Sequence, residues 1–190
     1  MKKIGIMGGT FNPPHIGHLI MANEVLHVLK LDEVRFMPNA IPPHKHKSND
    51  ATAQQRFAMT ELAIASNRRF KMEPYEIQQG GISYSYDTLK ALTAVEPDSD
   101  FYFIIGGDMI DTLHTWHRID ELLQLVHFVG VFRPGSNGET RLPIELVPAP
   151  VIDLSSTELR QRFADNRDVT YLIPQKVEQF IREEGLYGAK

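Results

Sequence analysis

Two histidines, His15 and His18, complete the string GGTFNPPHIGH at residues 8–18, directly after a short apolar run. If the histidines begin a helix, side chains three residues apart lie on one side of it, so both imidazoles face the same way. The first turn of a helix also offers unpaired N–H groups and the positive end of the helix dipole. The glycines allow a tight turn and close approach of a ligand to the backbone. Together these groups are suited to binding the anionic oxygens of a polyphosphate.

The same string has simpler interpretations. A glycine pair after a strand is most often only a turn, and a histidine pair can bind a metal ion. The sequence has no cysteine, no carboxylate close to the pair and no HExxH motif, which disfavours a metal site. It also lacks the Gly-Lys-Ser/Thr of a Walker A loop and the GxGxxG pattern. The prediction of phosphate binding therefore rests on the whole string and not on its glycines alone.

A second candidate segment is SSTELR at residues 155–160. Ser155 or Ser156 is expected to cap a helix whose first N–H groups can face an anion. Arg160 lies about one turn further on and can donate two hydrogen bonds to phosphate oxygens. An ordinary capping box is the alternative, because Ser155 precedes Glu158 by three residues.

Two further residues have types that suit a nucleotide ligand. Asp108 follows Gly106-Gly107 at the end of the run FYFIIGGD, where a carboxylate can accept hydrogen bonds from ribose hydroxyls or cap a helix. Trp116 is the only tryptophan, and its indole can stack on a flat ligand ring or pack in the core.

The elements that position these residues alternate between strands and helices, which predicts βαβ units and a mostly parallel sheet. We expect one α/β Rossmann-like, doubly wound domain over residues 1–190. Ligands bind such sheets beyond the carboxyl ends of the strands, so the segments that follow the strands should meet at one edge. The expected strands are 3–8, 33–38, 70–77, 101–108, 127–135 and 144–152, and the expected helices are 16–30, 52–66, 85–95, 119–125, 155–165 and 174–185.

Composition narrows the class of protein. The 190 residues are 42% hydrophobic and 23% charged, which is typical of a globular chain. The formal net charge of −4 disfavours a large nucleic-acid-binding surface, and no run approaches the roughly 20 apolar residues of a membrane span. The absence of cysteine excludes disulfides and suits a reducing compartment. We therefore expect a cytoplasmic protein that binds neither nucleic acid nor membrane.

The string GGTFNPPHIGH resembles the (H/T)xGH signature of the nucleotidylyltransferases, and in particular it is similar to the bacterial nicotinate mononucleotide adenylyltransferases. HxGH alone is a weak signal, because class I aminoacyl-tRNA synthetases have a similar HIGH. HxGH together with SSTELR, in a chain of this length, is far more specific. The resemblance also includes NAIPPHK (39–45), SYSYDTL (83–89), FIIGGDM (103–109), Trp116-His117, FRPG (132–135) and LIPQKVEQFIREEGLY (172–187).

This resemblance implies adenylyl transfer from ATP to nicotinate mononucleotide, which gives nicotinate adenine dinucleotide and pyrophosphate. The attacking phosphate is already an anion, so positioning and electrostatic stabilisation matter more than a general base. Mg²⁺ is expected to bridge the ATP phosphates, with water filling much of its coordination shell and no metal site built from protein side chains alone. The implied catalytic residues are His15, His18 and Arg160, and the implied ATP-binding residues are Gly8, Gly9, Thr10, Phe11, His15, His18, Ile105, Gly106, Asp108, Ser155, Ser156, Thr157 and Arg160.

The resemblance implies a separate group of residues for the mononucleotide. Ser85 stands where the family often has threonine, and His117 stands where relatives often have tyrosine or another polar residue. Trp116 would stack on the pyridine ring, and backbone donors around a helix start near Asp87 would hold the nicotinate carboxylate. The implied residues are Asn39, Lys45, Ser83, Tyr84, Ser85, Trp116, His117 and Arg133.

Several alternatives stay open at this point. The acceptor could be nicotinamide mononucleotide or phosphopantetheine, although phosphopantetheine enzymes usually have threonine where His15 stands. A cytidylyltransferase fits the remaining motifs poorly, and a regulator that binds nucleotide without catalysis would be expected to have lost His15, His18 or Arg160. The apolar residues of the C-terminal helix could form a homodimer interface or part of the core.

Overall fold

The computed structural model describes residues 1–41, 51–132, 141–150 and 152–190. Its strands form one six-stranded sheet in which all neighbouring strands are parallel, in the order β3-β2-β1-β4-β5-β6. This is the order of a Rossmann-like fold, and it confirms the expected fold class. The strands are β1 (Lys2–Gly9), β2 (Glu33–Pro38), β3 (Phe70–Met72), β4 (Ser99–Gly106), β5 (His127–Phe132) and β6 (Ile144–Pro148).

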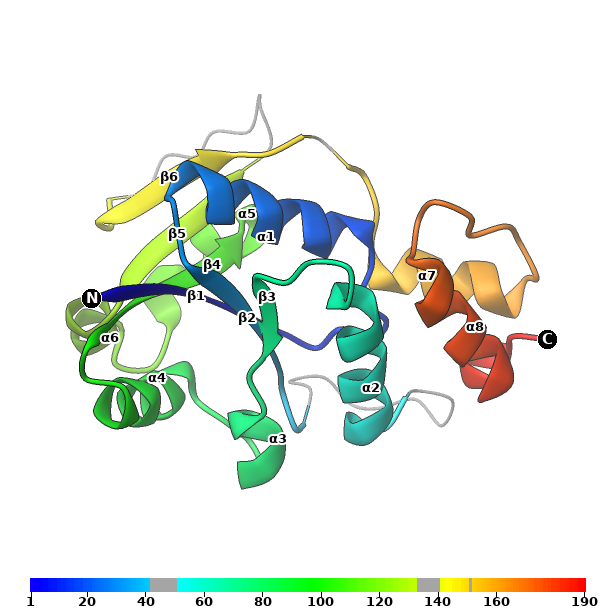
Figure 1. Ribbon diagram of the computed structural model, residues 1–190, viewed down its shortest axis with the longest axis horizontal. Helices are drawn as coiled ribbons and strands as arrows, with labels where there is room; N and C mark the ends of the chain where they lie inside the picture. Colours follow the sequence, from blue (N-terminus) through cyan, green and yellow to red (C-terminus); the bar gives the residue numbers. More distant parts are fainter. Residues whose placement is uncertain (42–50, 133–140, 151) are drawn as a thin grey trace.

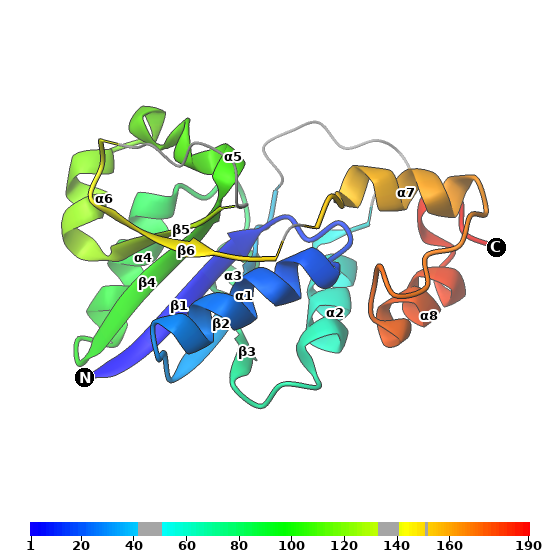
Figure 2. The same ribbon diagram turned by 90° about the horizontal axis from the view of Figure 1, so that it is seen from above.

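Helices cover both faces of this sheet (Figures 1 and 2). One face is covered by α1 (Ile16–Val28) and α2 (Ala53–Ile64), and the other by α4 (Ser85–Val95) and α6 (Ile119–Leu125). Figure 2 shows α7 (Ser156–Ala164) and α8 (Gln175–Glu183) beyond the carboxyl ends of the strands. Shorter helical segments are α3 (Tyr75–Gln79), α5 (Gly107–Ile110), η1 (Leu113–Thr115) and η2 (Leu186–Gly188). In the part of the chain that the structure describes, no helix has the length and hydropathy that a membrane crossing requires.

The central strands are buried on both faces, as in other parallel sheets. Along β1, Ile4 and Ile6 belong to the apolar cluster on the α4 and α6 side, whereas Met7 belongs to the cluster on the α1 and α2 side. Val177 and Ile181 of α8 are buried in this second cluster. The apolar residues of the C-terminal helix therefore pack inside the chain.

Some predicted boundaries are wrong. The expected strand over 70–77 ends at Met72, because Pro74 has no N–H for the sheet and is instead the N-cap of α3. The strand expected over 101–108 ends at Gly106, and Gly107 begins α5. The strand expected over 144–152 ends at Pro148. The helix expected over 85–95 is confirmed, because α4 runs from Ser85 to Val95.

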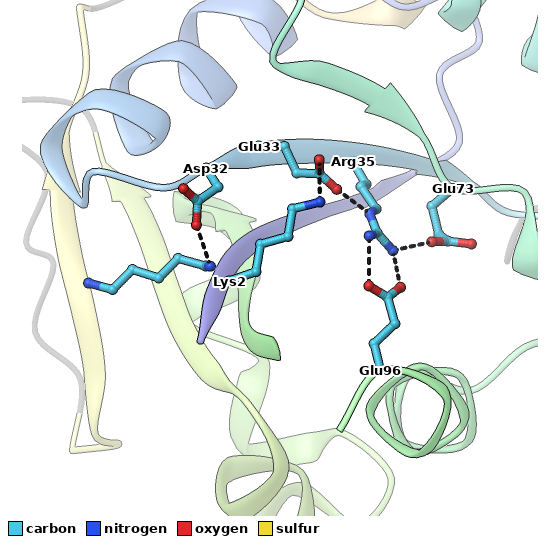
Figure 3. Close-up of polar contacts among 7 residues, drawn as sticks. Lys2, Asp32, Glu33, Arg35, Glu73 and Glu96 are labelled. Atoms are coloured by element: carbon cyan, nitrogen blue, oxygen red, sulfur yellow. Dashed lines mark hydrogen bonds and ion pairs between the residues drawn. The ribbon is translucent and has the colours of Figure 1, made fainter. Parts of the chain in front are cut away.

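A network of charged side chains joins β2 to the elements beside it (Figure 3). Arg35 donates to Glu33 at 2.8 Å, to Glu73 at 3.2 Å and to both carboxylate oxygens of Glu96 at 2.5 and 2.9 Å. Lys2 forms a further ion pair with Glu33 at 2.8 Å. The hydrogen bonds from Arg35 hold the pKa of the Glu96 carboxyl below its usual value. This network ties the end of α4 to the sheet.

Glu76 on α3 is a buried carboxyl that accepts a hydrogen bond of 2.9 Å from the Thr88 hydroxyl. Burial raises the pKa of Glu76, so its charged form is costly in the folded protein. Glu76→Gln keeps an oxygen for Thr88 and removes that charge. We expect it to raise the free energy of unfolding by about 1 kcal/mol near neutral pH.

The gain from Glu76→Gln should grow with pH, because a raised folded pKa means that the wild type loses stability as this carboxyl ionises. Urea unfolding at several pH values checks this, with the exposed Glu61→Gln on α2 as the control. Equal gains from both variants, or a gain that shrinks with pH, would contradict the prediction.

Candidate active site

An open cavity of about 720 Å³ lies at the carboxyl ends of the central strands. Its volume is typical of pockets that hold small-molecule ligands. It lies at the point where the strand order reverses between β1 and β4, as expected for this fold. Five of the predicted site residues line this cavity: His15, His18, Gly106, Ser155 and Ser156. The other lining residues are Gly17, Ile20, Met21, Gly107, Ile110, Asp111, Val131, Phe132, Ala149, Pro150, Ile152, Asp153, Leu154 and Glu158.

The histidine pair forms the N-terminal cap of α1. His15 is the N-cap residue, and its Nδ1 accepts the backbone N–H of Gly17 at 3.1 Å. The Nδ1 of His18 accepts the backbone N–H of His15, also at 3.1 Å. Together these bonds form a capping box, in which His15 is the N-cap residue and His18 is the residue three positions later. The three-residue spacing of the histidines therefore has a structural reason.

This cap also fixes the protonation of the two rings. A nitrogen that accepts an N–H cannot itself bear a proton, so each neutral imidazole has its proton on Nε2. Burial lowers the pKa of His15 to about 4, and burial together with the neighbouring His15 lowers the pKa of His18 well below 6.5. The ring centroids are only 3.9 Å apart, which further disfavours two positive charges. The site therefore presents two neutral Nε2–H donors at the end of a helix.

Gly17 is required by the His15 ring. A Cβ at this position would lie 2.9 Å from Cε1 and 3.0 Å from Nδ1 of His15. We expect Gly17→Ala to displace the ring and lower kcat by about 10²-fold, since small misplacements in a site cost this much. Ser66→Ala is the control, because Ser66 is exposed just after α2 and does not line the cavity. Steady-state kinetics of both folded variants checks this, and equal activities would contradict it.

The loop before the histidines is held by residues from the end of the chain. The Tyr187 hydroxyl donates to Oδ1 of Asn12 at 2.6 Å, and Nη1 of Arg160 donates to the Asn12 carbonyl at 2.8 Å. The Ser156 hydroxyl donates to the Pro13 carbonyl at 2.8 Å. The two predicted phosphate-binding segments are thus bonded to each other, although almost 150 residues separate them.

The segment SSTELR caps its helix as its sequence indicates. Oγ of Ser155 accepts the backbone N–H of Glu158 at 3.1 Å, so Ser155 is the N-cap of α7. Ser155 and Ser156 also line the cavity, so the cap and the site coincide. Thr157 and Arg160 do not line the cavity, and Nη2 of Arg160 donates to the Thr157 hydroxyl at 3.1 Å.

The glycine pair of the motif does not make the turn expected of it. Gly8 and Gly9 lie within β1, and neither has a positive φ. The chain turns at Phe11, whose φ is 50° and whose buried ring packs edge-on against His18 at 5.1 Å between centroids. A Cβ on Gly9 would lie 3.0 Å from the Phe11 ring, so this glycine makes room for Phe11.

Of the described residues that are expected to bind ATP at the end of β4, only Gly106 is found in the cavity lining. Ile105 is buried within the core on the α4 side and does not line the cavity, whereas the Gly106 backbone does. The Asp108 side chain lies outside the part that the structure describes.

Among the described residues, those expected to bind the mononucleotide do not line the cavity. Trp116 is partly buried and meets Phe103 and Phe128 edge-on, with centroids 6.0 and 6.2 Å away, so it packs against the core. Tyr84 and His117 are exposed and in ring contact at 5.2 Å. Ser83 and Ser85 are partly buried beside the start of α4, and Lys45 and Arg133 lie outside the described residues.

Sequence reasoning missed Arg56, whose side chain is fully buried and bonded to the loops after β1 and β2. A signal was present, because Arg56 shares the buried face of α2 with Met59, Thr60 and Ala63 at helical spacing. A cation on an apolar stripe indicates a specific polar partner. The bond from Tyr187 to Asn12 was also missed, and no local pattern joins residues so far apart.

Comparison with known proteins gives consistent results. The chain matches the cytidylyltransferase-like family over residues 6–162. It is 52% identical over its whole length to a protein named probable nicotinate-nucleotide adenylyltransferase from Geobacillus thermodenitrificans, of which it covers 88%. It is 49% identical to the nicotinate-nucleotide adenylyltransferase of Bacillus subtilis, covering 98% of this chain and 99% of that protein.

Solved structures share the fold. The nicotinic acid mononucleotide adenylyltransferase of Plasmodium falciparum, complexed with NaAD, superposes with a TM-score of 0.83 at 20% identity. The alignment covers 100% of this chain and 99% of that one. The same protein complexed with APC gives a TM-score of 0.80 at 18% identity, with the same coverage of both chains.

Proposed function

Because this chain belongs to the cytidylyltransferase-like family, and its full-length relatives are named nicotinate-nucleotide adenylyltransferases, we propose that it transfers the adenylyl group of ATP to nicotinate mononucleotide. The products are nicotinate adenine dinucleotide and pyrophosphate, a step of NAD biosynthesis. A phosphate oxygen of the mononucleotide attacks the α-phosphorus of ATP, and the bond from that phosphorus to the bridging oxygen breaks.

The observation that supports this reaction best is the pair of neutral Nε2–H donors at the start of α1, within a cavity also walled by the start of α7. Both helix ends present partial positive charge to the same space. The developing charge of the leaving pyrophosphate is negative, so preorganised donors stabilise the transition state more than the ground state. His15 and His18 act as hydrogen-bond donors in this proposal and transfer no proton.

Arg160 has two roles in this proposal, which are to hold the loop before the histidines and to contact the pyrophosphate. In the structure it donates to the Asn12 carbonyl and to Thr157. It therefore first fixes the loop on which the histidines depend. A direct contact with the pyrophosphate requires the guanidinium to turn toward the cavity, and this remains a prediction.

Mg²⁺ is proposed to enter with ATP. No group of three or more His, Asp or Glu side chains suited to a metal ion occurs among the described residues, whereas phosphate oxygens and water are ligands that Mg²⁺ prefers. When bound, Mg²⁺ would supply positive charge between the phosphates. Calorimetric titration of ATP with and without Mg²⁺ checks this, and equal affinities would contradict it.

The acceptor is decided by measuring pyrophosphate release from Mg²⁺ and ATP with purified protein. Nicotinate mononucleotide, nicotinamide mononucleotide and phosphopantetheine are compared. Fast release with the first compound alone is the expected result. Release only with another acceptor would keep the phosphate chemistry and overturn the proposed substrate, and no release at all, with tight ATP binding, would favour a regulator.

A cytoplasmic location completes the proposal. A reaction that consumes ATP and mononucleotides suits the cytoplasm. A homodimer would need a surface other than the apolar face of α8, because Val177 and Ile181 are buried in the core. The dimer is checked by the mass of the protein in solution, and a monomer at micromolar concentration would contradict it.

A further inference from the structure

Arg56 on α2 is the largest fully buried side chain in the described part of the chain, and it joins two loops. Its Nη1 donates to the Thr10 carbonyl at 2.7 Å and to Oδ1 of Asn39 at 3.1 Å. Its Nη2 donates to the carbonyls of Asn39 and Ala40 at 2.6 and 3.0 Å. One guanidinium thus holds the chain just after β1 and the chain just after β2, which are the two loops assigned above to ATP and to the mononucleotide.

These bonds also orient the Asn39 amide. Arginine has donors and no acceptor, so the amide must turn its Oδ1 toward Arg56. Its Nδ2 then faces Thr10 and donates to the Thr10 hydroxyl oxygen at 3.1 Å. Because that oxygen already accepts, the hydroxyl proton of Thr10 is left for another acceptor. Thr10 does not line the 720 Å³ cavity, but it is partly exposed directly after β1, where a phosphate oxygen could take this proton.

We propose that Arg56 is a positioning residue, which acts through Asn39 to make the Thr10 hydroxyl a hydrogen-bond donor to the substrate polyphosphate. This inference rests on the proposed function for the identity of the polyphosphate as ATP. Charge-assisted bonds to a buried guanidinium are shorter and stronger than neutral ones, so the chain Arg56–Asn39–Thr10 is held more rigidly than surface loops are.

The test compares Arg56→Lys with Arg35→Lys. Both variants keep the charge and lose the planar fork of donors. Arg35 is a suitable control because it is also largely buried and bonded to three carboxylates, yet its partners Glu33, Glu73 and Glu96 lie outside both loops (Figure 3). We expect Arg56→Lys to lower kcat at saturating substrates by about 10–100-fold, and Arg35→Lys to change it less than about 3-fold at a comparable loss of Tm.

A double-mutant cycle separates positioning from stability. Thr10→Val removes the hydroxyl at similar volume, and Thr10→Ser restores it. If Arg56 acts through this hydroxyl, Arg56→Lys should have less than about a 3-fold further effect on kcat in the Thr10→Val background. Equal effects in both backgrounds would show that Arg56 does not act through the Thr10 hydroxyl, and a kcat of Arg56→Lys within about 3-fold of the wild type would show that Arg56 only stabilises the fold. Either result would overturn the proposal.

Hydrogen exchange gives a measurement that does not depend on the reaction. The backbone N–H of Asn39 is bonded to the Gly9 carbonyl at 3.0 Å, so its exchange reports on the junction of the two loops. We expect Arg56→Lys to raise its exchange rate by about tenfold or more and Arg35→Lys to leave it unchanged relative to global unfolding. If the wild type releases no pyrophosphate, the proposed function fails, and the inference is then judged by this rate and by ATP affinity. An unchanged rate and affinity would overturn it.

Discussion

His18→Ala is expected to lower kcat by about 10²–10³-fold, which is the usual cost of removing one preorganised donor to a developing anion. The Nε2–H of His18 is the donor in question, since its Nδ1 is occupied by the backbone N–H of His15. His18→Ala removes the donor and also the cap on α1, and both losses are expected to lower kcat. Steady-state kinetics with saturating ATP and nicotinate mononucleotide measures the effect.

His18→Gln separates these two losses. Glutamine at the fourth position of a capping box can still accept the N–H of His15, so α1 keeps its cap. We therefore expect a Tm close to that of the wild type and a kcat that is still lowered by about tenfold or more, because the amide reaches the cavity in a different geometry. Wild-type turnover in His18→Gln or in a folded His18→Ala protein would disprove the donor role.

The free energy of unfolding is expected to fall by about 3 kcal/mol on account of His15 as the pH is lowered from 6.5 to about 4. The pKa of His15 is about 4 in the folded protein and 6.5 as its ordinary value, so the unfolded chain binds the proton first. The neutral cap stabilises the fold above pH 6.5, and this contribution is lost as the pH falls toward 4. The lowered pKa of His18 adds an effect of the same sign.

Urea unfolding at closely spaced pH values measures this dependence. Carboxylates also titrate in acid, so the informative quantity is the difference from His15→Asn, which keeps an acceptor at the N-cap without titrating. His114→Asn serves as the matched control, because His114 is exposed on η1. As the pH is lowered, the free energy of unfolding of the wild type should fall more steeply than that of His15→Asn. It should fall in parallel with that of His114→Asn. Parallel curves for all three proteins would rule out a buried neutral His15.

The sequence determined the class of fold and the location of the site. Alternation of strand and helix patterns depends on local periodicity, and parallel order then brings the carboxyl ends of the strands to one edge. His15, His18, Gly106, Ser155 and Ser156 could be placed together on this basis, and they do line one cavity. Ser155 was also readable as an N-cap, since capping depends only on residues within one turn.

The tertiary structure alone decided how the motif works. The histidines cap each other, Gly9 makes room for Phe11, and the turn lies at Phe11 instead of at the glycines. It also decided that α8 packs in the core and that Tyr187 and Arg56 hold the loops around the site. These contacts join residues that are distant in sequence, and a buried hydrogen-bond donor is satisfied by whichever acceptor the folded chain brings to it. Composition and periodicity carry no record of such pairs, because they describe which face of an element is buried and not what it meets there.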